Sequence, residues 1–370
     1  MEPKIKVLHI IKSLGRGGAE TLLPETLKLH AKDTFEFHYL YFLPWKNQMV
    51  EAIEQAGGKV TCLTATNNLQ MIRKVSAVIQ YIRQHNINIV HAHLPWAGVV
   101  ARLVHRRIKV PVIYTEHNKQ ERYHMATRLL NTLTFNWQTS AVAVSADVAV
   151  SIKKNINPSV PVIEILNGVN TDFFQRDISA GKQLRGQMGI PHNAVVVGTL
   201  AVFRFQKRLT EWLDVFKEAS EKHPNLYGLM VGDGPLKDEL VQRRKTLGLE
   251  DRVIMPGLQT EVKPWYSVMD VFMMTSVFEG LPIALLEAMS MECAIVTTDA
   301  GGVKQVIRHG VDGILVNVDQ WSGLPMKLDE LINDERKRIA FGVAARSRVV
   351  EAFSLKRMVG ELEEVYLSLT

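Results

Sequence analysis

The sequence predicts an α/β protein made of two Rossmann-like, doubly wound domains, each built on a parallel sheet. Short apolar stretches typical of buried strands alternate along the chain with stretches of helical periodicity, and this alternation favours parallel sheets with helices on both faces. The 370 residues are enough for two domains that each bury a core. A polar stretch at residues 174–193 separates two such series and is the predicted hinge.

The first domain is predicted to span residues 1–174. Its expected strands cover residues 4–11, 35–42, 60–63, 87–91, 110–115, 141–145 and 162–166. Its expected helices cover residues 21–30, 49–55 and 69–84, with a further helix that ends near residue 154.

The second domain is predicted to span residues 193–353. Its expected strands cover residues 194–200, 226–231, 252–255, 270–275, 294–298 and 313–316. A terminal helix follows at residues 354–369, because Ser354 can cap it and because Met358, Leu362 and Val365 form an apolar stripe.

Composition narrows the class of protein. A net charge of +6 and a pI near 9.1 favour an anionic partner, such as a nucleotide diphosphate, an anionic lipid surface or a nucleic acid. No apolar run reaches the roughly 18 residues that span a bilayer, and the first residues lead into a strand rather than a signal peptide, so we expect a cytoplasmic protein. Cys62 and Cys293 are far apart in apolar stretches, which argues against a disulfide framework.

Residues 278–289 form the most informative stretch. A predicted buried strand leads into a tight turn, and Pro282 then stands in the first turn of a helix, where its missing N–H costs nothing. The free N–H groups of residues 283 and 284 would face an anion, and phosphate is the natural candidate. Glu287 is five residues beyond Pro282, roughly 7 to 8 Å along the helix. Its carboxylate could therefore bind a ribose diol, although Glu279 and Glu287 could also be ordinary turn and helix residues.

A glycine-rich turn follows the first strand. Gly15 and Gly17 begin a dinucleotide fingerprint, but Glu20 stands where its third glycine belongs, which weakens a dehydrogenase hypothesis. Gly17 and Gly18 would allow the backbone to approach a substrate closely, or they could simply join a strand to a helix.

Three histidines stand near predicted strand ends. His91 and His93 share one face of a strand, but no third ligand is evident at usable spacing, so no metal site is predicted. His117 follows the strand at residues 110–115, where loops often carry ligand-binding residues, and the alternative is a capping or structural histidine.

The stretch Phe-Glu-Gly-Leu-Pro-x4-Glu-Ala-Met at residues 278–289 resembles the Glu-x7-Glu signature of the retaining glycosyltransferases of family 4, which have the two-Rossmann-domain GT-B architecture. Further matches occur in the family's order over nearly the whole chain: the Gly-Gly-Ala-Glu turn at 17–20, His-Ala-His-Leu-Pro at 91–95, Asn-Gly-Val-Asn at 167–170, Gly-Asp-Gly-Pro at 232–235 and Ala-Gly-Gly-Val at 300–303. The chain departs from the pattern at Asn170, where aspartate is usual, and at residues 291–294, which lack the usual Gly-x-Pro.

The resemblance implies a GT-B fold whose two parallel sheets face each other across a cleft, with the terminal helix crossing back onto the first domain. It also implies a retaining enzyme that moves a sugar from a UDP- or GDP-sugar to a hydroxyl acceptor in glycan, polysaccharide or glycolipid biosynthesis. The implied catalytic residues are Glu279, His117 and Lys207. The implied substrate-binding residues are Gly17, Gly18, Arg204, Lys207, Gly280, Leu281, Pro282 and Glu287, with Arg204 replacing an arginine that relatives carry at the position of Val202.

No cofactor and no metal are expected. The sequence contains no Asp-x-Asp, so Lys207, Arg204 and the helix that starts near Pro282 are expected to neutralise the departing diphosphate. Within the same fold, a sugar-nucleotide epimerase and a phosphorylase are alternatives. The Gly-Gly-Ala-Glu loop disfavours the first, and the chain length and the lack of a marked pyridoxal-phosphate lysine disfavour the second. From another class, the chain could be a catalytically silent nucleotide-sugar-binding partner.

The expected partners are the nucleotide sugar and a sugar, glycolipid or lipid-linked acceptor, and no nucleic acid. An anionic membrane surface is a further expected partner, which would place the protein peripherally at the inner face of a membrane. The basic and apolar residues that suggest it are Arg102, His105, Arg106, Arg107, Lys109, Lys119, Arg122, Arg128, Leu129, Leu130, Leu133 and Phe135. A solvated basic face is the alternative.

Overall fold

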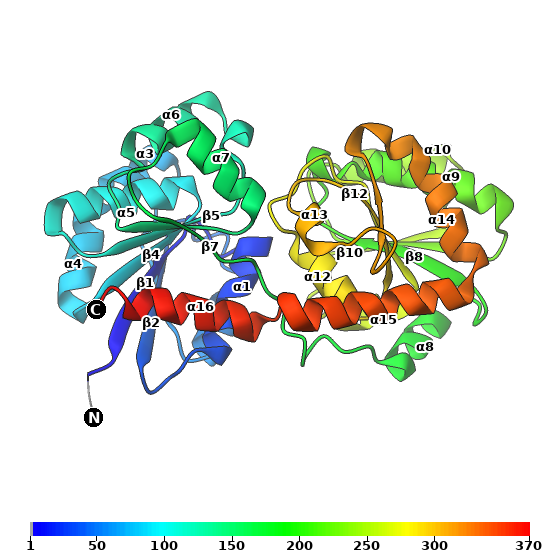
Figure 1. The fold of residues 1–370 in the computed structure, drawn as a ribbon, viewed down its shortest axis with the longest axis horizontal. Helices are drawn as coiled ribbons and strands as arrows, with labels where there is room; N and C mark the ends of the chain where they lie inside the picture. Colours follow the sequence, from blue (N-terminus) through cyan, green and yellow to red (C-terminus); the bar gives the residue numbers. More distant parts are fainter. Residues whose placement is uncertain (1–2) are drawn as a thin grey trace. The chain divides into compact units, whose positions relative to one another are not determined.

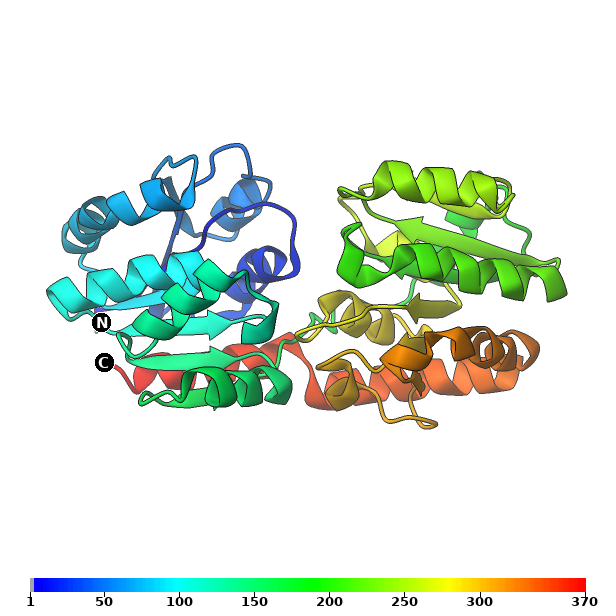
Figure 2. The same ribbon diagram turned by 90° about the horizontal axis from the view of Figure 1, so that it is seen from above.

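The computed structural model describes residues 3–370, and the chain divides into two compact units (Figure 1). Unit 1 consists of Met1–Asn167 and Leu355–Thr370, and unit 2 consists of Gly168–Ser354. Each unit contains one fully parallel sheet with helices on both faces (Figures 1 and 2). Among the described residues, no helix is both long and apolar enough to cross a bilayer.

Unit 1 is built on a seven-stranded sheet. Its strands are β1 (Ile5–Ile10), β2 (Phe35–Tyr41), β3 (Lys59–Cys62), β4 (Ile89–His93), β5 (Val112–Glu116), β6 (Ser140–Ala143) and β7 (Val162–Glu164). Its helices are α1 (Gly18–Leu29), α2 (Val50–Gln55), α3 (Asn68–Arg73), α4 (Val75–His85), α5 (Pro95–Ile108), the 3₁₀ turn η1 (Gln120–Arg122), α6 (Met125–Thr134), α7 (Ala146–Ile156) and α16 (Leu355–Leu367). The strand order β3-β2-β1-β4-β5-β6-β7 reverses direction between β1 and β4.

Unit 2 is built on a six-stranded sheet. Its strands are β8 (Val195–Leu200), β9 (Leu226–Val231), β10 (Val253–Gly257), β11 (Val271–Met274), β12 (Ala294–Thr298) and β13 (Ile314–Val316). Its helices are α8 (Ile178–Gln187), η2 (Phe205–Lys207), α9 (Leu209–Lys222), α10 (Lys237–Thr246), α11 (Lys263–Val268), α12 (Ile283–Ser290), α13 (Val303–Val306), η3 (Val318–Gly323), α14 (Leu324–Asn333) and α15 (Glu335–Ala352). The strand order β10-β9-β8-β11-β12-β13 reverses between β8 and β11.

The central strands are buried on both faces, which is why they read as continuous apolar runs rather than alternating ones. In unit 2 this holds for β11 and β12, whose residues are all buried. In unit 1 it holds for β4 and β5, which carry histidine, threonine and glutamate among their buried residues. Buried polar groups need hydrogen-bond partners, so these side chains are expected to be paired within the unit.

The C-terminal helix α16 belongs to unit 1, where it contacts α1 (Figure 1). Glu363 accepts a hydrogen bond from the backbone N–H of Ala31 at 2.8 Å and lies 2.9 Å from Nδ1 of His30. The hydroxyl of Tyr366 lies 2.7 Å from Nδ1 of His91 in the centre of the sheet. These contacts attach the end of the chain to the end of α1 and to β4.

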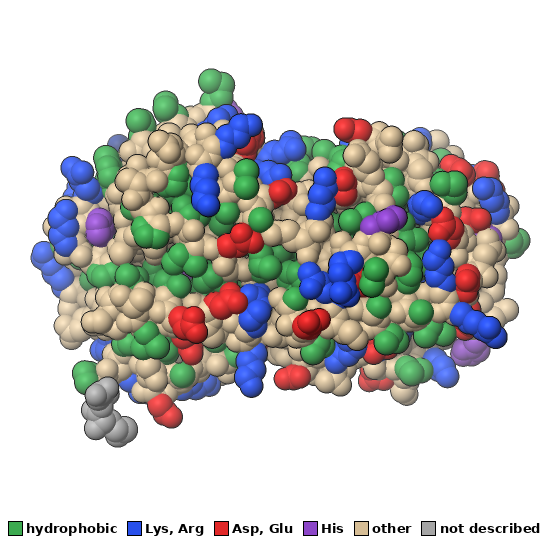
Figure 3. Space-filling view, in the orientation of Figure 1, with side chains coloured by type: hydrophobic (Ala, Val, Ile, Leu, Met, Phe, Trp, Pro, Cys, Tyr) green, Lys and Arg blue, Asp and Glu red, His purple; other side chains and the backbone are tan. Residues whose placement is uncertain are grey.

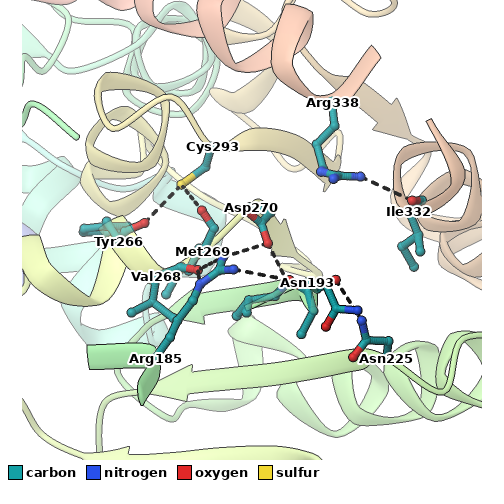
Figure 4. A network of polar contacts seen from close by, with 12 residues as sticks. Arg185, Asn193, Asn225, Tyr266, Val268, Met269, Asp270, Cys293, Ile332 and Arg338 are labelled. Carbon is teal, nitrogen blue, oxygen red and sulfur yellow. Dashed lines mark hydrogen bonds and ion pairs between the residues drawn. The ribbon is translucent and has the colours of Figure 1, made fainter. Parts of the chain in front are cut away.

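The prediction of a hinge at residues 174–193 is wrong. This segment belongs to unit 2 and contains α8, which packs against α11. Arg185 of α8 donates to the carbonyl of Val268 and to Oδ2 of Asp270 at 2.8 Å, which is the centre of the network in Figure 4. The units meet in sequence at residues 167/168, earlier than the predicted end of the first domain at residue 174, and again at 354/355.

Smaller corrections concern helix limits. The helix predicted at residues 69–84 is two helices, α3 and α4, with Lys74 between them. Helix α1 begins at Gly18 rather than at residue 21, because Gly17 is its extended N-cap.

Arg102 and Phe135, which the sequence placed on a membrane-facing surface, are core residues instead. The Arg102 guanidinium donates to Gln138 at 2.7 Å and to Asn131 at 2.6 Å, and it lies over the Tyr114 and Phe135 rings. A buried cation of this kind is tolerated because Nε and Nη1 are paired with these acceptors, while Nη2 has no hydrogen-bond partner among the described residues.

We expect Arg102→Met to lower the free energy of unfolding of unit 1 by about 3 kcal/mol or more, because the buried acceptors of Asn131, Thr134 and Gln138 lose their donor. The measurement is urea unfolding. The exposed Arg107→Met on the same helix is the matched control and should change stability by no more than about 0.5 kcal/mol. Equal effects of the two variants would show that the network does not stabilise the unit.

Candidate functional site

The candidate residues collect at the carboxyl ends of the strands where each sheet reverses its strand order. In open α/β sheets this is the position at which ligands bind. In unit 1, Gly17 and Gly18 follow β1, His93 ends β4, and His117 follows β5. In unit 2, Lys207 follows β8 and Glu279 follows β11.

The unit 1 site contains a fourth histidine, His9, that the sequence analysis missed. His9 in β1 pairs in register with His91 in β4, and ring nitrogens of His9, His91 and His93 all lie within 4.8 Å of one another. The separation of 82 residues between His9 and His91 hides this relation in the sequence. The sequence analysis predicted no metal site because it found no third ligand, and the fold supplies one candidate.

Hydrogen bonds already engage these imidazoles. Nδ1 of His9 lies 2.9 Å from Nε2 of His93, and Nε2 of His91 lies 2.6 Å from Oγ1 of Thr115. Burial lowers the pKa of His9, His91 and His93 well below the ordinary histidine value, and their mutual repulsion lowers each pKa further. The cluster is therefore neutral at pH 7.

His117 is half-buried next to this cluster. Its Nε2 lies 3.5 Å from Nδ1 of His93, and burial lowers its pKa to about 4. At neutral pH His117 is thus an uncharged imidazole, with one N–H and one lone pair.

Glu116, the residue before His117, holds the β5 end in place. Its carboxylate is fully buried, accepts from Tyr114 at 2.8 Å and from Gln120 at 2.5 Å, and also accepts from Tyr123. Burial raises the pKa of Glu116, and the hydrogen bonds offset part of that rise. Because these partners stand on both sides of His117 in the chain, they fix the segment that carries it. The sequence analysis assigned Glu116 no role, since nothing in the sequence showed that it is buried.

In unit 2 the structure brings Lys207 and Glu279 into direct contact. Nζ of Lys207 lies 2.6 Å from Oε1 of Glu279, and the Ser276 hydroxyl donates to the same oxygen at 2.6 Å. Thr275 ties the two loops together, because its hydroxyl donates to the backbone carbonyls of Lys207 and Arg208. Ser276 escaped the sequence analysis although it lies two residues beyond the end of β11, and its position near a strand end is the signal that could have found it.

The loop at residues 278–282 leads into α12, whose first helical residue is Ile283. Pro282 is the N-cap, one place before the predicted first-turn position, and its side chain makes no cap hydrogen bond. The N–H groups of Ile283 and Ala284 are therefore available to an anion, as α-helix geometry leaves them without an intrahelical acceptor. Glu287 stands one turn further along, and one of its carboxylate oxygens accepts from the buried Tyr266 hydroxyl at 2.7 Å.

The remaining predicted residues lie around this loop. Gly280 is half-buried and Leu281 is buried beside Pro282, so they shape the turn. Arg204 precedes η2, and its side chain is exposed. Unit 2 thus groups Lys207, Glu279 and the α12 N-terminus, while His117 belongs to unit 1 with Gly17 and Gly18.

The unit 2 arrangement suits an anionic ligand that carries hydroxyl groups. A lysine, an exposed arginine and free helix N–H groups can neutralise a diphosphate. Glu279 and Glu287 offer carboxylate oxygens to hydroxyl donors.

Family models and curated relatives identify this chain as similar to glycosyltransferases. The chain matches "Glycosyltransferase Family 4" over residues 16–173 and "Glycosyl transferases group 1" over residues 182–348. The N-acetyl-alpha-D-glucosaminyl L-malate synthase of Bacillus anthracis is 29% identical over 308 residues, or 81% of this chain and 78% of that protein. The UDP-Gal:alpha-D-GlcNAc-diphosphoundecaprenol alpha-1,3-galactosyltransferase of Escherichia coli is 20% identical over 380 aligned positions, with 99% of this chain and 97% of that protein covered.

Solved structures show the same fold. Anabaena Alr3699/HepE in complex with UDP and glucose has a TM-score of 0.88 at 22% identity, covering 98% of this chain and 100% of that chain. A glycosyltransferase from Rickettsia africae has a TM-score of 0.82 at 18% identity, covering 99% of this chain and 98% of that one.

Gly301 provides a test of how the Glu279 loop is held. Its φ is +58°, and a Cβ there would lie 2.2 Å from the backbone oxygen of Glu279. We expect Gly301→Ala to lower the free energy of unfolding by about 1 to 2 kcal/mol because of the left-handed backbone. Displacing the loop should lower it by about a further 1 to 3 kcal/mol. Gly310→Ala is the matched control, because Gly310 has a φ of +77° with nothing within 4 Å. Urea unfolding compares the two variants. Equal decreases in the free energy of unfolding would show that the Glu279 loop moves aside without measurable cost.

Proposed function

We propose that this chain, which belongs to the group 1 and family 4 glycosyltransferases and has their GT-B fold, is a retaining enzyme that moves a sugar from a nucleotide-sugar donor to an acceptor hydroxyl. The observation that carries the proposal is the contact between Lys207 and Glu279 at the strand-order reversal of unit 2, beside the N-terminus of α12. Retention of configuration follows from the family resemblance.

The donor diphosphate would lie at the N-terminus of α12. There Lys207, Arg204 and the helix N–H groups would neutralise the charge that develops when the nucleotide departs, so the reaction would need no metal. Lys207 would exchange its present partner, Glu279, for phosphate oxygens. Glu279 would then be available to the hydroxyls of the donor sugar, and Glu287 to the ribose.

A uridine nucleotide is the donor class that we propose to test first. The HepE structures hold UDP or UDP-glucose, and the E. coli relative is named for UDP-Gal. The acceptor would be a sugar, a glycolipid or a lipid-linked sugar in polysaccharide biosynthesis, in keeping with a relative from Salmonella typhi that is named Vi polysaccharide biosynthesis protein VipC/TviE.

His117 would act on the sugar and acceptor rather than on the nucleotide. It is neutral at pH 7, since burial lowers its pKa to about 4, so it would act by hydrogen bonding and not as a cation. The proton of the acceptor hydroxyl would pass to the departing phosphate in a front-side reaction.

The function is tested by a screen of nucleotide sugars, followed by two variants that should fail in different ways. Ligands that bind only the folded protein raise its unfolding temperature, so thermal shift selects the donor. Glu287→Ala should lose hydrogen bonds worth about 1.5 to 3 kcal/mol, which weakens nucleotide binding roughly 10- to 150-fold by calorimetry. His117→Ala should keep nucleotide affinity within about twofold and lower sugar transfer by orders of magnitude.

The exposed Glu250→Ala is the control for Glu287→Ala and should leave nucleotide affinity unchanged. Unaltered nucleotide affinity in Glu287→Ala would refute the ribose assignment. Transfer at the wild-type rate in His117→Ala would make that histidine structural.

A membrane surface is the further partner that we propose, and α6 is the element that would contact it. Met125, Leu129 and Leu133 recur every four residues on one face of α6 and are 85%, 61% and 64% exposed. Hydrophobic side chains protrude over α6 at the upper edge of Figure 3. The exposed cations Arg122 and Arg128 stand before and within this helix and could meet anionic headgroups.

We expect the protein to sediment with vesicles that contain anionic phosphatidylglycerol, and to be released at high salt because screening weakens the attraction. The double variant Leu129→Gln/Leu133→Gln should lose binding. Leu258→Gln, which changes a leucine of unit 2 that is 56% exposed, should not. Absence of salt-sensitive sedimentation in the wild type would leave α6 a solvated helix.

A further inference from the structure

Three histidines of unit 1, His9, His93 and His117, form a chain of hydrogen-bonded rings. Nδ1 of His9 and Nε2 of His93 are 2.9 Å apart, and the two ring centroids are 5.1 Å apart with planes inclined by only 9°. Nδ1 of His93 and Nε2 of His117 are 3.5 Å apart, and those centroids are 5.8 Å apart. In both pairs, the distance between the ring centroids exceeds the distance between the facing nitrogens by about one ring width. Each of these nitrogens therefore points along the axis that joins the two rings. This is the aligned geometry that hydrogen bonds prefer.

The same alignment argues against a shared metal ion. Each imidazole nitrogen would lie about 2.0 to 2.1 Å from a zinc ion. The facing nitrogens of His9 and His93 are 2.9 Å apart on their common axis, which leaves no room for an ion between them. His91 is also committed, because the hydroxyls of Tyr366 and Thr115 lie within hydrogen-bond distance of its two nitrogens.

The hydrogen bonds between these three histidines can all be donated in one direction or all in the other. The buried end at His9 favours one of the two directions. Nε2 of His9 is buried without a hydrogen-bond partner among the described residues. If the protons ran toward His9, this atom would be a buried N–H without an acceptor, which is rarely found in proteins. If the protons instead run toward His117, Nε2 of His9 carries only a lone pair, which needs no acceptor. His9 then donates to His93, and His93 donates to Nε2 of His117.

This direction determines which nitrogen of His117 carries the proton. Since Nε2 accepts from His93, the neutral ring of His117 must hold its proton on Nδ1. Within residues 3–370, no group forms a hydrogen bond with Nδ1 of His117, so this N–H remains for a ligand.

We propose that His93, supported by His9, is a positioning residue that holds His117 in the Nδ1–H tautomer, so that His117 serves the transfer reaction as a hydrogen-bond donor to a substrate oxygen and has no lone pair left to act as a general base. The proposal rests on the transferase function above. Its ligand class is an oxygen acceptor, namely a sugar hydroxyl or a phosphate oxygen.

The first test is made on the wild-type protein, and a variant serves only to assign the signals. Long-range nitrogen–hydrogen NMR correlations report which ring nitrogen of a neutral histidine carries the proton, and the signals of His117 are assigned by their loss in His117→Ala. The wild-type protein at pH 7 should show the Nδ1–H form of His117. The Nε2–H form would overturn the proposal.

The second test compares two nearly isosteric variants of His93. Asn places an amide group where Nδ1 of His93 stands and can still donate to His117, whereas Leu cannot. We expect His93→Leu to give a mixture of His117 tautomers and to lower the turnover of transfer roughly 10- to 100-fold, as loss of a residue that orients a histidine does in metal sites. His93→Asn should restore the Nδ1–H form and most of the turnover. Donor KM should change less than about twofold in both.

The outcomes separate this inference from the proposed function. If Leu and Asn variants have the same His117 tautomer and the same turnover, His93 does not position His117. If the wild-type protein transfers no sugar from any donor but shows the Nδ1–H form of His117, the positioning of His117 by His93 stands and the transferase assignment of this site fails.

Discussion

The parallel arrangement of strands is the constraint on which the rest of the structure depends. All strands of a parallel sheet end at the same edge, so residues that follow β1, β4 and β5 meet although they are distant in the chain. The order reversal at β1/β4 and at β8/β11 separates the loops there and leaves space for a ligand. Each unit therefore carries its candidate residues at one position of its sheet.

Electrostatics differ between the two positions. In unit 2, Lys207 and Glu279 are partly accessible and paired, so a ligand with phosphate and hydroxyl groups could replace the contact between them. In unit 1 the polar groups are buried, and burial, with a smaller contribution from mutual repulsion, keeps His9, His91 and His93 uncharged. Hydrogen bonds from Tyr114 and Gln120 hold Glu116 in the same apolar surroundings. Such networks are stable only when their members are paired, which fixes side-chain geometry more tightly than apolar packing does.

Prediction from sequence succeeded where local pattern and tertiary structure agree, and failed where burial was misjudged. The limits of β9 and β12 match the predicted strands, because apolar runs between turn residues are local signals. The segment at 174–193 is polar, yet Arg185 docks its helix onto unit 2 through backbone carbonyls and Asp270. Arg102 looked like a surface cation, yet Asn131, Thr134 and Gln138 supply buried partners that composition cannot reveal.

The sequence by itself determined the α/β class, the two sheets and the family, because these depend on periodicity and on motifs such as residues 278–289. It also placed Lys207, Glu279 and His117 at strand ends. Only the tertiary structure decided which side chains touch: Lys207 with Glu279, Tyr266 with Glu287, and His9 with His93. The reason is physical, since hydrogen bonds and burial depend on the distance between atoms, and neither spacing nor composition encodes the distance between residues far apart in the chain.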